Sequence, residues 1–177
     1  MLGFTAHIVV AADVDADWVH TRVRPWELSD AFTPPFLGEL ADKLGRRVNA
    51  IDMLGLAPPL TGPPPLPFEE ILVDHPRVRR AQRYRDDIRV WTTEGGILTL
   101  GRGLTGRWEI GLEVDEGYRG RGLGRALAES ARHLVPDGRP VWAQIAPGNA
   151  ASVRALIAAG YRPVGMEALL VRHAGEH

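Results

Sequence analysis

The sequence predicts an α/β (α+β) protein: a sheet flanked by helices, with one β-α-β crossover in the C-terminal half. Two patterns and one motif support this. The spacing of apolar residues in that half gives the order strand, helix, strand, helix, strand, strand. Before it, β-rich runs alternate with glycine-containing turns, which is typical of an antiparallel meander. A glycine-rich stretch, Tyr118 to Gly124, follows the last of these runs and precedes a helix-like run.

The N-terminal part contains a strand and a helix. Phe4 to Ala11 has a strand-like composition, and Phe36 to Leu44 has apolar residues at helical spacing, with Gly45 as a stop signal. The segment Leu56 to Pro67 holds six prolines, which cannot donate hydrogen bonds to a helix or sheet. We expect it to be extended, either as a linker or as a surface loop beside a substrate groove.

A second helix and the meander occupy residues 74 to 114. Asp74 is a candidate N-cap with Pro76 in the first turn, and arginines cover much of the helix surface. A solvated face is the simplest interpretation of Arg77 to Arg89, and an anionic substrate or nucleic acid is the alternative. The meander is predicted from three β-rich runs: Ile88 to Thr93, Gly96 to Gly101 and Arg107 to Val114.

The remaining elements follow the glycine-rich stretch. Leu123 to Val135 is predicted to be a helix that ends before a Pro-Asp-Gly turn, and Val141 to Ile145 a buried strand. Asn149 is a suitable N-cap for the next helix, which Gly160 ends. The chain is then expected to close with a hairpin, made of Tyr161 to Gly165 and Ala168 to Val171.

Composition excludes several classes of function. At 177 residues the chain has the length of one domain, and its net charge of -1 lacks the basic excess of a nucleic-acid binder. The absence of cysteine excludes disulfides and a Cys nucleophile. No metal site is expected, because the acidic run 13–17 has Trp18 and Arg24 where a calcium loop needs Gly and Glu. Without a signal peptide or a run of about 18 apolar residues, we expect a cytoplasmic protein that does not bind membranes.

The glycine-rich stretch predicts a phosphate site. Glycines at the start of a helix let backbone N–H groups surround an anion, and the helix dipole favours negative charge there. A nucleotide P-loop is excluded because Gly124 is followed by Arg125 and Ala126 instead of Lys and Ser or Thr. A dinucleotide fold is excluded because the motif lies late in the chain, after a meander.

The motif and its surroundings resemble those of the GNAT superfamily of N-acetyltransferases. The pattern Arg119-x-x-Gly122-x-Gly124, preceded by Leu112-Glu113-Val114, is similar to the family's acyl-CoA pyrophosphate motif. A second motif, from Asn149 to Gly165, resembles the family's CoA-side helix, which begins with Asn and ends in Gly and an aromatic residue. The resemblance covers about residues 88–171 and is only vague over residues 1–87.

This resemblance implies a single 177-residue GNAT domain: a mixed, twisted central sheet in which two neighbouring parallel strands splay apart to admit acetyl-CoA. Residues 88–171 would form the CoA half and residues 1–87 the acceptor half. Backbone groups of Leu112 and Val114 would bind the pantetheine arm. The pyrophosphate would be held by the stretch Arg119, Gly120, Arg121, Gly122, Leu123, Gly124 and Arg125. Asn149 would be a further cofactor contact, or a plain helix cap.

Two glutamates are candidate bases, and two positions that are often catalytic in the family hold other residues here. Glu113 and Glu109 are the candidate bases, and their even separation places them on the same side of a regular strand. Glu113 ranks first because it lies nearer the expected thioester. The family often has a Tyr acid where this chain has Leu156, and some relatives have a Glu where it has Gln144. Tyr161 lies where the family has a core aromatic residue, and Tyr118 neighbours the cofactor loop.

The resemblance therefore implies an acetyl-CoA-dependent N-acetyltransferase that acts on an amine acceptor, either a small molecule or a protein amino group. The missing Tyr and Glu leave open a second function, a non-catalytic GNAT-fold module that binds acyl-CoA or a regulatory partner. No metal, nucleic acid or membrane is implied. The protein is expected to be a monomer or a homodimer.

Overall fold

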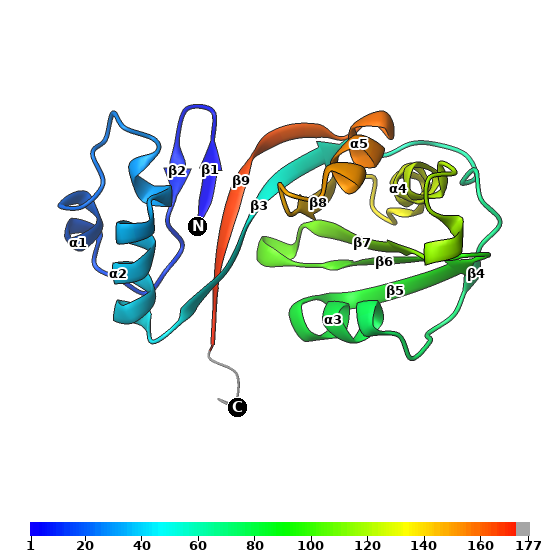
Figure 1. The fold of residues 1–177 in the computed structure, drawn as a ribbon, viewed down its shortest axis with the longest axis horizontal. Coiled ribbons are helices and arrows are strands. Elements are labelled where there is room, and N and C mark those ends of the chain that lie inside the picture. Colours follow the sequence, from blue (N-terminus) through cyan, green and yellow to red (C-terminus); the bar gives the residue numbers. More distant parts are fainter. Residues whose placement is uncertain (173–177) are drawn as a thin grey trace. The chain divides into compact units, whose positions relative to one another are not determined.

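The structure is a computed structural model that describes residues 1–172 (Figure 1). Its residues form two compact units. One contains Met1–Met53 and the segment from Val164 onward, and the other contains Leu54–Pro163. Strands β3 (Arg47–Ala57) and β9 (Arg162–Val171) contribute residues to both units. That the chain acts as a single GNAT domain stays a prediction.

The larger unit contains the predicted meander, so that prediction is confirmed. Strands β5 (Asp86–Thr93), β6 (Gly96–Arg102) and β7 (Trp108–Val114) pair antiparallel in sequence order. The short strand β4 (Glu69–Glu70) adds to β5, and β8 (Val141–Ile145) runs parallel to β7. The resulting order is β8-β7-β6-β5-β4, with β3 next to β8. The parallel pair makes this a mixed sheet.

Helices α3 (Pro76–Tyr84) and α4 (Leu123–Leu134) cover opposite faces of this sheet. A Cβ on Gly96 would lie 3.0 Å from Leu127 of α4, whereas a Cβ on Gly111 would lie 3.4 Å from Arg77 of α3. Gly96 is paired with Val114 of β7, so these two residues share one face of the sheet. Gly111 is an odd number of residues from Val114 along β7 and therefore points to the opposite face. Helix α5 (Ala150–Ala158) packs against α4.

One helix cap differs from the sequence-based expectation, and one connection packs against a helix. The N-cap of α3 is His75, whose Nδ1 accepts a hydrogen bond from the Arg77 N–H at 3.1 Å, so the expected Asp74 cap is wrong. The proline-rich segment after β3 lies against the end of α4. There the Leu60 N–H donates to the Arg132 carbonyl at 2.8 Å, and Arg132 Nε donates to the Pro58 carbonyl at 2.9 Å.

The smaller unit contains the short strands β1 (Leu2–Phe4) and β2 (Ile8–Val9), which form an antiparallel hairpin where one strand was expected. Strand β9 pairs with β1, so the local order is β2-β1-β9. The expected C-terminal hairpin is wrong, because β9 is one continuous strand. Helices α1 (Ala16–His20) and α2 (Pro34–Leu44) complete the unit. Short 3-10 turns occur at Asp30–Phe32 in this unit, and at Leu104–Gly106 and Glu116–Tyr118 in the larger one.

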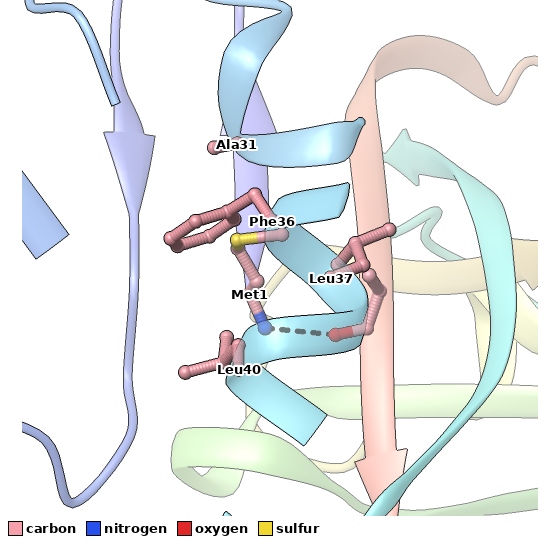
Figure 2. Close-up of a cluster of buried hydrophobic side chains, with 6 residues drawn as sticks. Met1, Ala31, Phe36, Leu37 and Leu40 are labelled. Carbon is pink, nitrogen blue, oxygen red and sulfur yellow. Dashed lines mark hydrogen bonds between the residues drawn. The ribbon is translucent and has the colours of Figure 1, made fainter. Parts of the chain in front are cut away.

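The core of the smaller unit forms around α2 (Figure 2). Phe36, Leu37 and Leu40 recur at helical spacing and are all buried, as the sequence pattern predicts. Gly45 ends the helix in the left-handed conformation, with φ of 59°, which glycine adopts without strain. The side chain of Met1 packs in the same cluster, and its amino group donates to the Ala168 carbonyl of β9 at 2.8 Å.

Candidate functional site

The parallel strands β7 and β8 are paired only at their beginnings. The register joins Trp108–Ile110 of β7 to Val141–Ala143 of β8. Strand β7 continues to Val114 and β8 to Ile145 without further pairing between the two strands. The facing edges of the two strands are therefore not joined to each other at their ends. This is the splay that the resemblance implied.

The glycine-rich stretch follows the open end of β7. Gly120 and Gly122 have φ of 75° and 86°, in the region that only glycine occupies freely. A Cβ at either residue would meet nothing within 4 Å, so the space beside the backbone is open. The loop therefore combines exposed amides with room for a ligand.

Helix α4 begins at this loop with its first N–H groups unused. Gly122 is the N-cap and offers no side-chain acceptor, and the first turn has no acidic residue. The Ala126 N–H donates to the Gly122 carbonyl at 3.1 Å, which leaves the N–H groups of Leu123, Gly124 and Arg125 without an acceptor inside the helix. Together with the helix dipole, these donors suit a diphosphate. The local structure thus fits the phosphate group that the motif predicted.

The arginines of the loop have different environments. Arg119 Nε donates to the Val114 carbonyl at 3.2 Å, so this side chain holds the loop to the end of β7. Arg121 is exposed and lies 6.0 Å from the ring of Tyr118. Arg125 is 4.0 Å from Glu129, one turn later on the helix, and its side chain is 60% exposed. The guanidinium groups of Arg121 and Arg125 are therefore accessible to an anion.

Helix α4 also lies close to β7 and α5 at its start. A Cβ on Gly124 would lie 3.7 Å from Val114 and 3.8 Å from Ala155, in ordinary van der Waals contact with both. Asn149 caps α5, where its Oδ1 accepts from the Ser152 N–H at 3.1 Å. The predicted cap is confirmed. The cofactor contact of Asn149 stays a prediction, and its amide N–H groups are in an exposed position.

The two candidate bases lie on the face of β7 that α3 covers, in different environments. Glu109 is 4% exposed, and its two oxygens accept from Arg85 Nε at 2.9 Å and from Arg107 Nε at 2.7 Å. The side chain of Glu113 is 40% exposed and lies 3.3 Å from Arg77 Nε. Both oxygens of Glu109 are thus occupied and shielded, whereas Glu113 can be reached from solvent.

The guanidinium partners of these glutamates were missed by the sequence analysis, which treated the arginines of α3 mainly as a solvated face. Arg85 directly follows α3, and its Nη2 also donates to the side-chain amide oxygen Oε1 of Gln144 at 3.2 Å. A signal was present in the sequence: carboxylates on a strand that a helix covers need cations nearby. Arg77 in the first turn of α3 pairs with Glu113, and Arg85 directly after the helix pairs with Glu109.

The two remaining candidate positions, Leu156 and Tyr161, are buried in the core. Leu156, at the position of the family's usual Tyr, is buried in α5. Tyr161 is 2% exposed, and its hydroxyl donates to the Ala128 carbonyl at 3.2 Å. Burial raises the pKa of Tyr161, so its proton is not readily released. Tyr161 therefore belongs to the core, as the sequence analysis expected.

Within residues 1–172, no three His, Asp or Glu side chains lie close enough together to hold a metal ion. None of the helices in those residues is long and apolar enough to cross a bilayer.

The comparisons with known proteins agree with the site. Residues 89–161, which run from β5 to the end of the α5 region and include the glycine loop and Asn149, match the model of the acetyltransferase (GNAT) family. No curated protein and no solved structure matches the chain. The GNAT family generally transfers acyl groups and typically uses acetyl-CoA. Residues 89–161 of the larger unit therefore match the GNAT acetyltransferase family, and this match supports membership of the GNAT superfamily.

Proposed function

We propose that this protein is an N-acetyltransferase, which transfers an acetyl group from acetyl-CoA to the amine of a small molecule or of a protein. The observation that carries the proposal is the open N-terminus of α4 beside the splayed ends of β7 and β8. A diphosphate can occupy the first feature and an extended pantetheine arm the second. The family match over residues 89–161 supports both assignments.

The proposed CoA contacts come mostly from the backbone. Leu112 and Val114 lie on the part of β7 that is not paired with β8, and their backbone groups would hydrogen-bond the pantetheine amides. The N–H groups of residues 119–124 would surround the diphosphate, and Arg121 and Arg125 would add charge-assisted hydrogen bonds. The side-chain N–H groups of Asn149 would donate to CoA while its Oδ1 caps α5.

The proposed chemistry is a direct attack of the amine on the thioester carbonyl. The C–N bond forms, the C–S bond breaks, and CoA leaves as a thiolate that takes a proton from water. We propose Glu113 as the base that receives the proton of the amine, because it is accessible on β7 one residue before the strand ends. Glu109 has the weaker claim, because Arg85 and Arg107 occupy both of its oxygens.

Calorimetric titration with acetyl-CoA tests the cofactor. The wild type should bind at tens of micromolar or better, and Gly122→Glu should abolish binding by placing a carboxylate beside the diphosphate site. Gly62→Glu is the matched control, because Gly62 has nearly the same φ, 85°, and equal open space in another loop. Absence of heat with the wild type, or full binding by Gly122→Glu, would reject the proposal.

A second candidate function has specific support. The buried Leu156 and the engagement of Gln144 by Arg85 leave two positions that are often catalytic without acid or base groups. A GNAT-fold module that binds acyl-CoA without turnover would have this appearance. A screen of diverse amines with free-thiol detection separates the two: thiol release above background hydrolysis with any acceptor excludes the binding module.

A further inference from the structure

The proposed acetyl transfer does not use one side-chain contact near the glycine loop. The hydroxyl of Tyr118 donates a hydrogen bond to Oε1 of Glu94 at 2.7 Å. Glu94 belongs to the turn between β5 and β6, whereas Tyr118 ends the 3-10 turn that leads into the loop. The contact therefore joins two segments that are 24 residues apart in the sequence.

The ring of Tyr118 also lies directly on Gly95 of the same turn. A Cβ on Gly95 would fall 2.2 to 2.6 Å from three atoms of the Tyr118 ring, closer than real atoms approach. Gly95 has φ of 72°, so both its conformation and this close packing require glycine. Tyr118 is thus held at two points, by its ring and by its hydroxyl.

Beyond Tyr118 the loop has few constraints of its own. The backbone entry is fixed by the Asp115 N–H, which donates to the Gly95 carbonyl at 2.9 Å, and by the Arg119 side chain on Val114. Next come Gly120 and Gly122, whose Cα atoms have open space beside them. Two glycines have large conformational freedom, and ordering them on binding costs free energy unless the loop is already held.

We propose that Tyr118, anchored by Glu94 and Gly95, is a positioning residue that holds the loop so that the N–H groups of residues 120–125 converge on the diphosphate of CoA. This rests on the proposed function. The Tyr118 hydroxyl occupies one oxygen of the Glu94 carboxylate. The hydrogen bond to Glu94 raises the pKa of Tyr118, so the hydroxyl keeps the proton that it donates at neutral pH.

Calorimetric titration of acetyl-CoA into four variants tests the inference. Tyr118→Phe keeps the ring but loses the hydrogen bond, and should raise the Kd roughly 3- to 10-fold, the value of one hydrogen bond. Glu94→Ala should do the same, and the double variant should be no weaker than either single one, because both remove one contact. Glu94→Gln should bind nearly like the wild type, since its amide oxygen still accepts.

Two other ligands separate positioning from general damage to the fold. S-acetylpantetheine, which lacks the diphosphate, should bind wild type and Tyr118→Phe equally. The affinity for 3′-dephospho-CoA should fall by the same factor as that for acetyl-CoA, because both carry the diphosphate. The thermal midpoint should stay within a few degrees of the wild type, since the contact is exposed.

Several results would overturn the inference. Equal acetyl-CoA affinity of wild type and Tyr118→Phe would do so, as would an equal loss for S-acetylpantetheine. A loss for acetyl-CoA with full affinity for 3′-dephospho-CoA would assign the effect to the 3′-phosphate and reject the diphosphate. If the wild type itself binds no acetyl-CoA, the proposed function fails together with the inference, and the wild-type titration alone identifies that case.

Discussion

Arg85 and Glu109 form an ion pair inside the larger unit: Arg85 Nε lies 2.9 Å from Glu109 Oε2, and 13% and 5% of the two side chains are exposed. Arg85 directly follows α3 and Glu109 lies near the start of β7, so the pair connects a helix to the sheet beneath it. Arg107 occupies the second oxygen of Glu109 at 2.7 Å. Buried charges are tolerated when each has such partners.

This arrangement predicts a structural effect for Glu109. Glu109→Gln should lower the free energy of unfolding by about 3 to 5 kcal/mol, because it leaves the guanidinium groups of Arg85 and Arg107 without their buried counter-charge. Urea unfolding followed by circular dichroism measures the change. Glu70→Gln is the control. The side chain of Glu70 is 47% exposed in its ion pair with Arg89, so the loss should stay below about 1 kcal/mol. An equally stable Glu109→Gln protein that has lost activity would instead favour Glu109 as the base.

Glu113 is expected to affect the rate and not the stability. Glu113→Gln should lower the rate of acetyl transfer by about 10²- to 10⁴-fold and remove its rise with pH, because the amide cannot accept the proton of the amine. Steady-state rates across a pH series measure both effects. Glu116→Gln changes an exposed carboxylate three residues away and should keep the wild-type profile. A Glu113→Gln profile with the wild-type pH dependence would exclude Glu113 as the base.

Asn149 is expected to have two separable roles. Asn149→Ala should cost about 1 kcal/mol of stability, because the Ser152 N–H loses its cap. Asn149→Ser should keep that stability, since a serine oxygen also caps a helix, but should weaken acetyl-CoA binding through loss of the amide N–H groups. Thermal unfolding and calorimetry on both variants separate the roles. Full acetyl-CoA affinity of the Asn149→Ser variant would exclude the cofactor contact and leave helix capping as the role of Asn149.

The smaller unit should become sensitive to acid through Asp30. The hydrogen bonds from Arg24, at 2.7 Å to each oxygen, lower the pKa of Asp30 from 3.8 to about 2. Because the folded-state pKa is the lower one, the stabilisation is complete above about pH 4 and is lost as the pH falls towards 2. The wild type should therefore lose more unfolding free energy than Asp30→Asn between pH 5 and 2. Asp42→Asn, an exposed aspartate of α2, should keep the wild-type acid dependence.

Local signals explain why much of the larger unit could be predicted. The meander, α4, β8 and the Asn149 cap depend on periodicity and capping within short windows, and all appear as expected. Strand β3 was missed because its first half is only partly buried and mixed in polarity, so it shows neither a helical nor a strand period clearly. The expected C-terminal hairpin was wrong for another reason. Gly165 resembled a turn residue, but a Cβ there would lie 2.1 Å from the Gly3 carbonyl oxygen, so a neighbouring strand requires the glycine.

The sequence by itself determined the glycine loop, the helix that follows it and the shared side of β7 for Glu109 and Glu113, because each depends on residues close together in the chain. Tertiary structure alone decided that Glu109 is buried between two arginines while Glu113 stays accessible. It also decided that Tyr118 is held by the turn at Glu94 and Gly95. Apart from Arg107–Glu109, which are two positions apart, these hydrogen bonds join residues 24 to 36 positions apart. Their energies depend on burial and distance, which exist only once α3 and the sheet have packed.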